Sequence, residues 1–285
     1  MFVYICGMIQ ATKIIDIMNS KDPVSEILSN RDLFPFIDEC MIGYGRSKWH
    51  SEGDVWRHTE LAISAVFHMD HDWMDILIAL LHDIGKKSAF EFNEGKNMIG
   101  HDAVGAKMAA DWMKTNGFDN DEIEIVKYVI SMHMRVKKLA EMTSEYDVMD
   151  IVTHPYFGRL KILGYADCEA TLGPDMKPSS DFNDVLNAKY VSKWEGRCRP
   201  LPVVRTVDLA EAGIPYAMYA EAKERTLKQQ INGGLTRSES LIKSIVNDPV
   251  FRSKIEEKRK KDRQFIEDLK NYTESITKRN PKTKG

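Results

Sequence analysis

The apolar residues of this chain recur at steps of three and four, the spacing that gathers them on one face of an α-helix. In the segment 55–69, for example, Leu61, Ala62, Ala65 and Val66 follow this period. The same pattern predicts helices at 11–19, 72–84, 102–116, 121–133, 156–172, 183–194, 216–231, 237–246 and 249–277. No hairpin or strand–helix–strand pattern interrupts them, so the sequence predicts an all-α protein.

Several polar residues stand where helices are expected to begin. Asp54 and either Asp119 or Asp121 are predicted N-caps, because a short polar side chain can accept a hydrogen bond from the first turn of the helix that follows. Thr236 and Glu239 have the spacing of a capping box. These positions fix where three of the predicted helices start.

Breaks in the helical pattern divide the chain into parts. The prolines of Arg199–Pro202 interrupt regular structure, and Asp248 and Pro249 mark the start of a long charged helix. We therefore expect an N-terminal helical extension, a main domain, a small helical C-terminal region and a charged basic helix or tail. Their expected bounds are 1–48, 49–196, 197–247 and 248–285.

Charge is distributed unevenly along the 285 residues. The net charge is -3, but the segment Arg252–Gly285 has 12 Lys/Arg and 6 Asp/Glu, which leaves -9 for the rest. An acidic body of this kind argues against a protein that coats nucleic acid along its whole length. Two interpretations of the basic tail stay open, a solvated charged helix and a segment that contacts RNA.

The cysteines and the N-terminus bear on the compartment. None of the four cysteines forms a C-x-x-C pair, so a disulfide framework or structural zinc site is not expected and a reducing cytoplasm fits. The apolar start Met1–Gly7 is followed by Gln10, Lys13 and Asp16, too soon for a membrane span, and it lacks the features of a secretory signal. We expect a cytoplasmic protein without a membrane segment.

Histidines and aspartates stand at the ends or on the faces of the predicted helices. The candidate metal ligands are His58, His82, Asp83, His101, His133 and Asp167. Imidazoles combined with carboxylates suit Mn, Fe, Co, Ni or Zn better than a set of oxygens alone would. A divalent ion with open positions lowers the pKa of water near it, and two ions about 4 Å apart can clamp both oxygens of a phosphoryl transfer.

Each of these residues also has an ordinary structural explanation. A single histidine on an apolar helix is usually a core residue with satisfied hydrogen bonds, and a buried aspartate such as Asp167 usually caps a helix or pairs with a base. The complete set is harder to explain in this way. A His-Asp pair beside Gly85 and Lys86, with histidines on both sides and a late aspartate, favours a metal site.

The order His58…His82-Asp83…Asp167 resembles the H…HD…D signature of the HD superfamily of metal-dependent phosphohydrolases. The similarity is closer to the HD domain of bacterial tRNA nucleotidyltransferases, the CCA-adding enzymes. It is carried by the segments Trp49–Thr59, Leu81–Lys86, Gly100–Ala106, Pro200–Pro215 and Gln230–Glu239. Three features depart from that family. Asp102 stands where glutamate is more common, and Pro215–Met218 stand where a Pro-Gly-Pro-like turn is expected. The residues before Trp49 are too few for a nucleotidyltransferase head.

The resemblance implies an HD-type helical bundle and roles for individual residues. His58, His82, Asp83 and Asp167 would bind a divalent metal, with Asp83 bridging if there are two ions. The expected cofactor is one or two ions of Mn, Mg, Ni, Co or Fe. His101 and His133 would hold a second ion or contact the phosphate of the substrate.

The catalytic residues expected beside the ligands are basic. Lys86, and with less support Arg135, would neutralise the charge that develops on phosphate. For His50, a catalytic and a structural role both stay open. In the catalytic role it would contact the phosphate or protonate the leaving oxygen. In the structural role it would support the loop before Asp54. Asp83 is expected to be both a metal ligand and a catalytic residue, because it lies at the reaction centre.

The implied function is a phosphatase, 2′,3′-cyclic phosphodiesterase or 2′-nucleotidase acting on nucleotides or RNA ends. Another HD reaction stays open, such as (d)NTP triphosphohydrolysis, release of pyrophosphate from an alarmone, or 5′-nucleotidase action. So do a non-catalytic RNA-binding module and one subunit of a split tRNA nucleotidyltransferase. The sequence makes no prediction of the oligomeric state.

Overall fold

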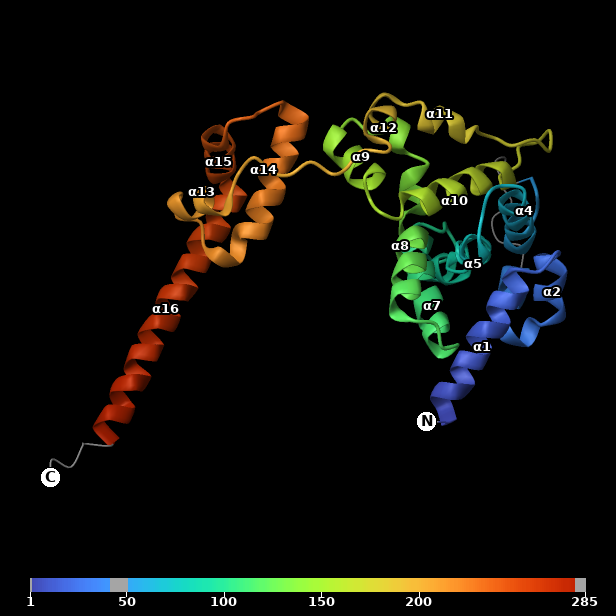
Figure 1. Ribbon diagram of the computed structural model, residues 1–285, viewed down its shortest axis with the longest axis horizontal. Coiled ribbons are helices and arrows are strands. Elements are labelled where there is room, and N and C mark those ends of the chain that lie inside the picture. Colours follow the sequence, from blue (N-terminus) through green and yellow to red (C-terminus); the bar gives the residue numbers. More distant parts are fainter. Residues whose placement is uncertain (1, 42–50, 280–285) are drawn as a thin grey trace. The chain divides into compact units, whose positions relative to one another are not determined.

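The computed structural model describes residues 2–41 and 51–279, and these residues are mainly helical (Figure 1). The α-helices are α1 (Phe2–Met18), α2 (Pro23–Ser29), α3 (Ile37–Cys40), α4 (Val55–Phe67), α5 (Trp73–Leu81), α6 (Lys86–Phe92), α7 (His101–Thr115), α8 (Asn120–Val136), α9 (Glu145–Val152), α10 (Phe157–Ala170), α11 (Phe182–Leu186), α12 (Lys189–Trp194), α13 (Thr206–Glu211), α14 (Tyr219–Gly233), α15 (Ser238–Asn247) and α16 (Pro249–Arg279). Short 3-10 helices lie at Arg31–Leu33, Leu139–Glu141 and Tyr216–Met218. The described residues contain no strand, only an isolated bridge between Leu172 and Pro178. The all-α prediction is confirmed.

None of the helices in the described part of the chain is long and apolar enough to cross a membrane. The described residues form two compact units, which we call unit 1 and unit 2. Unit 1 comprises residues up to 143 together with 147–198, and unit 2 comprises 144–146 together with the residues from 199 onward. The N-terminal helices therefore belong to the same unit as the candidate metal ligands.

Unit 1 is a bundle built around α5. Almost every residue of this helix is buried, from Met74 to Leu81, as expected for a helix that is apolar on all sides. Helices α1, α4, α8 and α10 pack against it, and α7 packs along α8. The burial of α5 fixes the position of the residues that follow it, His82 and Asp83.

The structure differs from the predicted helix 72–84 at its C-terminal end. Helix α5 stops at Leu81, and residues 82–85 form a turn held by hydrogen bonds from Ile84 N to Leu81 O at 3.4 Å and from Lys86 N to Asp83 O at 3.0 Å. These bonds span three residues instead of four, so the chain tightens and then starts α6, which the pattern did not predict.

Two of the predicted N-caps are confirmed and one capping prediction is wrong. Asp54 accepts a hydrogen bond from Arg57 N at 2.8 Å, and Asp119 forms a capping box with Glu122. Helix α15, however, begins at Ser238, so Thr236 lies outside it and caps nothing. The hydroxyl of Ser238 donates instead to Asp208 Oδ2 at 2.9 Å, a contact between α15 and α13.

Glycines allow α7 to approach the turn after α5. A Cβ atom at Gly85 would overlap the carbonyl oxygen of His101 and the amide nitrogen of Gly105, and one at Gly105 would lie 3.2 Å from Gly85 N. Only glycine permits backbones to pack at this distance. The contact brings the start of α7, where His101 stands, next to the turn that contains Asp83.

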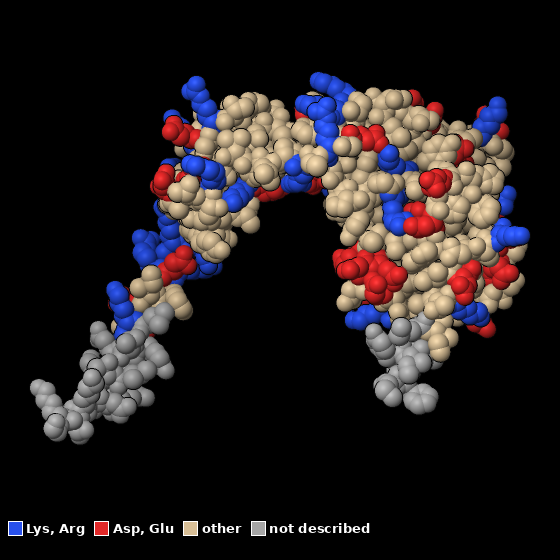
Figure 2. All heavy atoms as spheres, viewed as in Figure 1, with Lys and Arg blue, Asp and Glu red and all other residues tan. Residues whose placement is uncertain are grey.

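Unit 2 has a small core of its own. It is formed by Val204, Leu209, Ile214, Met218, Ala222, Leu241, Ile245, Phe251 and Ile255. Phe251 and Ile255 come from the first turns of α16, so the start of the charged helix is part of this core, whereas we expected a boundary at 248. Beyond Ile255, the described side chains of α16 are largely exposed, and basic ones are prominent among them (Figure 2).

We predict that Gly85→Ala lowers the free energy of unfolding by about 2 kcal/mol, because the added methyl group forces the backbones of α7 and the turn apart. Denaturant titration monitored by circular dichroism measures this change. The matched control is Gly158→Ala on α10, where a Cβ atom meets nothing within 4 Å and a gain in helix propensity is expected. Equal stability of the two variants would contradict the close approach.

A second prediction concerns the N-terminus of α5. Arg159 donates to Asp72 Oδ2 at 2.7 Å and to the buried Asp75 Oδ1 at 2.8 Å, and its hydrogen bonds lower the pKa of Asp72 despite the opposing effect of partial burial. Arg159→Gln should therefore cost about 2 kcal/mol at pH 7. The control is Lys161→Gln, on the same helix as Arg159, which removes an ion pair with Glu195 whose side chains are 35% and 34% exposed, and it should cost well under about 1 kcal/mol.

The same interaction predicts a dependence on pH. A carboxyl group whose pKa is lower in the folded state stabilises the fold above its unfolded pKa, near 4, and this contribution is lost as the pH falls through the folded pKa. The wild type should thus lose stability more steeply than Arg159→Gln between about pH 5 and pH 2. Parallel curves from denaturant titrations across this range would refute the assignment.

Candidate metal centre

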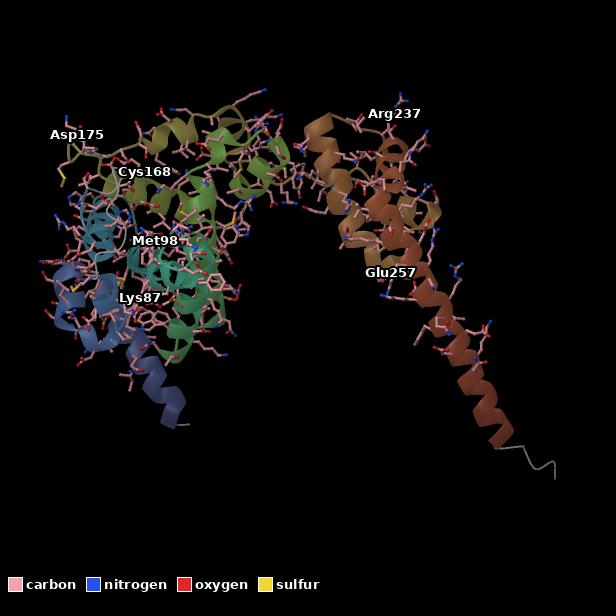
Figure 3. All side chains as sticks on the ribbon, turned by 180° about the vertical axis from the view of Figure 1, so that it is seen from behind. Lys87, Met98, Cys168, Asp175, Arg237 and Glu257 are labelled. Carbon is pink, nitrogen blue, oxygen red and sulfur yellow. The ribbon has the colours of Figure 1, made fainter. Side chains whose placement is uncertain are left out.

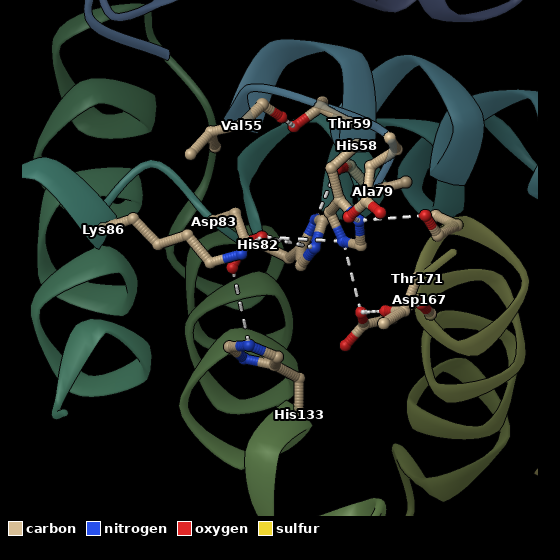
Figure 4. Close-up of polar contacts among 12 residues, drawn as sticks. Val55, His58, Thr59, Ala79, His82, Asp83, Lys86, His133, Asp167 and Thr171 are labelled. Carbon is tan, nitrogen blue, oxygen red and sulfur yellow. Dashed lines mark hydrogen bonds and ion pairs between the residues drawn. The ribbon is translucent and has the colours of Figure 1, made fainter. Parts of the chain in front are cut away.

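Five segments of unit 1 bring the candidate ligands together in its interior. His58 comes from α4, His82 and Asp83 from the turn after α5, His101 from the start of α7, His133 from the last turn of α8 and Asp167 from α10. All six side chains are buried. Figure 4 shows five of them, with the ring of His58 facing Asp167 and the ring of His133 facing Asp83.

The first group of donor atoms surrounds one oxygen of Asp83. Asp83 Oδ2 lies 3.2 Å from His82 Nε2 and 3.6 Å from His58 Nε2. Asp167 Oδ1 lies 3.2 Å from the same nitrogen of His58. His58, His82 and Asp83 offer ligand atoms that all lie within 4.8 Å of one another, a spacing that one ion can bridge.

The second group surrounds the other oxygen of Asp83. Asp83 Oδ1 lies 3.3 Å from His101 Nε2 and 3.8 Å from His133 Nε2. The two Nε2 atoms are 3.2 Å apart. Two imidazole nitrogens that both carry lone pairs repel at this distance unless a proton or a cation lies between them. Asp83 therefore presents one oxygen to each group.

The backbone fixes the tautomer of all four histidines. Each Nδ1 atom lies within hydrogen-bond distance of a main-chain carbonyl oxygen. The partners are Ala170 for His58 at 3.3 Å, Ala79 for His82 at 2.8 Å, Met98 for His101 at 2.9 Å and Ile130 for His133 at 2.6 Å. A carbonyl can only accept, so Nδ1 carries a proton and Nε2 faces the carboxylates, with a free lone pair whenever the ring is neutral.

Glu52 supports the first group from outside. Its Oε1 atom lies 3.2 Å from His58 Nδ1, and its Oε2 atom accepts a hydrogen bond from Leu172 N at 3.0 Å. A carboxylate behind a histidine is the usual means of orienting a metal-binding imidazole. The sequence analysis assigned no role to Glu52, although it lies six residues before His58.

Each aspartate also pairs with a lysine. Lys86 contacts Asp83 Oδ2, and Lys137 donates to Asp167 Oδ2 at 2.9 Å. Lys86 was predicted, whereas Lys137 was missed. Lys137 follows His133 by four residues and so lies on the same face of its helix, which was the available signal.

The charges around the two aspartates determine how they titrate. Burial alone would raise the pKa of Asp83, but His82, Lys86 and a hydrogen bond from His101 outweigh it and hold the pKa well below its usual range. The pKa of Asp167 is also held well below its usual range, because the effects of Lys137 and His58 outweigh the effect of burial. Both carboxyl groups are therefore ionised at neutral pH.

The pKa values of the histidines shift in different directions. Burial, together with the neighbouring His82, lowers the pKa of His133 to about 4, so this ring is neutral and able to bind a metal. Burial also acts to lower the pKa values of His58 and His101, but hydrogen bonds to Asp167 and Glu52, and to Asp83, outweigh it and raise them. The carboxylates thus favour positive charge at these two positions.

The remaining predicted residues lie beside the donor atoms. A cavity of about 550 Å³ opens next to them, lined by Lys86, Met98, Ile99, Gly100, His101, Asp102, Met134, Arg135 and Lys138. Arg135 thus lies on the wall of the cavity. Met98, labelled in Figure 3, belongs to the same wall. His50 lies outside the described residues.

The residues present fit a divalent metal. The buried Nε2 atom of His82 has no hydrogen-bond partner among the described residues, although it faces Asp83. An acceptor nitrogen is rarely left in this state in a protein interior. Imidazole nitrogens with carboxylate oxygens form the donor set that divalent transition metals prefer, and the two groups that share Asp83 could each hold one ion.

The fold and the site together define an all-α bundle with a buried cluster of histidines and aspartates that could hold a metal. A family model described as HD domain matches residues 70–162, which include His82, Asp83, His101 and His133. The match supports the HD resemblance and extends over about a third of the chain. No curated protein and no solved structure matches it, and the similarity of the C-terminal region to tRNA nucleotidyltransferases is not confirmed.

We predict that Lys137→Met lowers the free energy of unfolding of the EDTA-treated protein by about 3 kcal/mol, because it leaves the buried Asp167 carboxylate without its cation. Lys138→Met is the control, since Lys138 is exposed and should change stability by less than about 0.5 kcal/mol. Thermal denaturation of both variants in EDTA measures the difference, and similar melting temperatures would contradict the pairing.

Proposed function

We propose that unit 1 is a divalent-metal-dependent phosphohydrolase of the HD type that acts on phosphate esters of nucleotides or RNA ends. The observation that supports this most directly is the position of Asp83, whose two oxygens face separate groups of imidazole nitrogens within the region that matches the HD domain. Such an arrangement is suited to two ions that share one carboxylate.

In this proposal, His58, His82, Asp83 and Asp167 hold the first ion. His101 and His133 hold the second together with Asp83. When bound, divalent ions activate water for attack on phosphorus and neutralise the charge on the phosphoryl oxygens. The Nδ1–carbonyl contacts keep the four imidazoles oriented without any further cost at the moment of reaction.

Lys86 is the residue best placed to act on the substrate. It contacts Asp83 and also lines the cavity, with its side chain only 14% exposed. A partly buried ammonium group next to a phosphoryl centre stabilises negative charge more strongly than it would in water. Lys86 therefore neutralises the oxygens of the scissile phosphate as the ester bond breaks and water replaces the alcohol.

The expected substrates are phosphomonoesters and 2′,3′-cyclic phosphodiesters. One water molecule is consumed for each ester bond that breaks, giving phosphate and an alcohol, or an opened monoester from the cyclic compound. The same centre serves other HD reactions, namely (d)NTP triphosphohydrolysis and 5′-nucleotidase action. A panel of substrates separates these alternatives.

The first test compares the wild type with Asp83→Ala on 2′,3′-cyclic AMP, 2′-AMP, 3′-AMP, 5′-AMP, dNTPs and p-nitrophenyl phosphate, with Mg, Mn, Co, Ni and Fe(II), the last supplied anaerobically. The variant should lose more than about 10²-fold in kcat/KM, since even residues behind metal ligands often cost that much. Asp111→Ala on α7, which breaks an exposed pair with Lys107, is the control and should keep wild-type activity.

Metal content provides a readout that does not depend on turnover. The wild type should bind up to two Mn²⁺ per chain by equilibrium dialysis, and His133→Ala should bind one. Binding of no divalent metal by the wild type, or turnover that survives Asp83→Ala, would rule the proposal out.

A further inference from the structure

Two cations on the cavity wall, Arg135 and Lys138, have no side-chain partner among the residues that the structure describes. Arg135 and Lys138 are exposed, and neither makes an ion pair or side-chain hydrogen bond with any described residue. Both line the cavity of about 550 Å³ that adjoins the metal centre. The third basic residue of the cavity, Lys86, is already engaged with Asp83.

Besides Lys86, the cavity wall has two basic side chains, Arg135 and Lys138, and one acidic side chain, Asp102. In the proposed reaction, the scissile phosphate is neutralised by the bound metal and by Lys86. Arg135 and Lys138 then remain as two positive charges on the wall of the cavity. Charged groups that line a cleft attract ligands of the opposite sign. The unpaired charges therefore suit a second anion on the same ligand.

The rest of the wall suits the part of a ligand between two anions. Met98, Ile99 and Met134 form an apolar surface, and Ile99 is 79% exposed. An exposed isoleucine at a cavity gains by covering a flat apolar group such as a nucleobase. Asp102 adds one acceptor, which can bind a ribose hydroxyl or an exocyclic amine.

We propose that this cavity selects a nucleotide that carries a second phosphate, across the ribose from the phosphate that is hydrolysed. Arg135 and Lys138 bind the second phosphate, and the apolar wall contacts the nucleoside between the two. This assignment rests on the proposed phosphohydrolase function and narrows its substrate class. It makes a nucleoside monophosphate a poorer substrate than the corresponding bisphosphate.

Two ligands share this chemistry. One is a nucleoside 3′,5′-bisphosphate, and the other is the end of an RNA strand, whose terminal nucleoside has a phosphate at its 3′ side and a phosphodiester at its 5′ side. Arginine binds either group with two parallel hydrogen bonds, and lysine binds it as a point charge. The cavity therefore recognises both in the same way.

Basic residues near a helix C-terminus also stabilise the helix dipole. That effect would account for Arg135 in the last turn of α8, and it predicts a loss of stability without a change in substrate preference. Lys138 stands beyond the end of the helix yet lines the cavity with Arg135. Substrate preference is thus the readout that separates the two roles.

The experiment measures KM for adenosine 3′,5′-bisphosphate, 3′-AMP and 5′-AMP with the metal-loaded wild type. We expect the bisphosphate to have a KM at least about tenfold lower than the better monophosphate, the ratio that about 1.4 kcal/mol produces. In Arg135→Gln/Lys138→Gln this ratio should fall to about 2 or less, as for exposed charges that no longer pair. A 3′-phosphorylated oligoribonucleotide tests whether an RNA end binds better than the bisphosphate.

Lys127→Gln is the matched control, because Lys127 lies on the same helix but does not line this cavity, and it should keep the wild-type ratio. Equal KM values for bisphosphate and monophosphates in the wild type, or a preference that survives in the double variant, would overturn the assignment.

A binding experiment tests the second phosphate site separately from the proposed phosphohydrolase function. Isothermal titration of the EDTA-treated protein with adenosine 3′,5′-bisphosphate and with 3′-AMP requires no turnover. Absence of hydrolysis of every substrate would defeat the phosphohydrolase proposal alone. Tighter binding of the bisphosphate, lost in the double variant, would still support the second anion site, and equal binding would refute it.

Discussion

The arrangement of unit 1 depends on one buried charge, the carboxylate of Asp83. An ion taken out of water costs several kcal/mol unless other charges and hydrogen bonds compensate it. Here the compensation comes from Lys86 and from the imidazoles of His82 and His101. The end of α5 and the starts of α6 and α7 must therefore lie close together, and the packing of the bundle keeps them there.

Backbone atoms provide much of the order at that point. Four main-chain carbonyl oxygens accept from the Nδ1 atoms and so direct the Nε2 lone pairs inward. Gly85 and Gly105 let two backbones approach closely enough for His101 to reach Asp83. Because these contacts involve the main chain, the orientation of the ligands is coupled to the stability of the helices that carry them.

The basic residues of unit 1 differ in role between the buried aspartates and the exposed wall of the cavity. Lys137 and Lys86 pair with the two buried aspartates, so they compensate charge inside the protein. Arg135 and Lys138 are exposed on the cavity wall, where their charge is free for a ligand. Lys86 belongs to both groups, since it contacts Asp83 and lines the cavity. The basic residues thus extend from the buried carboxylates, where a metal fits, to the exposed wall of the cavity.

The sequence by itself determined the helical class and all six candidate donors, because the three-to-four period and the His-Asp order are local properties of the chain. It also located the caps at Asp54 and Asp119. It did not reveal the turn after Leu81, the support from Glu52 or the pairing of Lys137 with Asp167. The contacts of Lys137 and Glu52 depend on distances between segments far apart in the sequence, 30 residues for Lys137 with Asp167 and 120 for Glu52 with Leu172. Only the packing of the helices sets such distances, so only the tertiary structure could decide which charges meet.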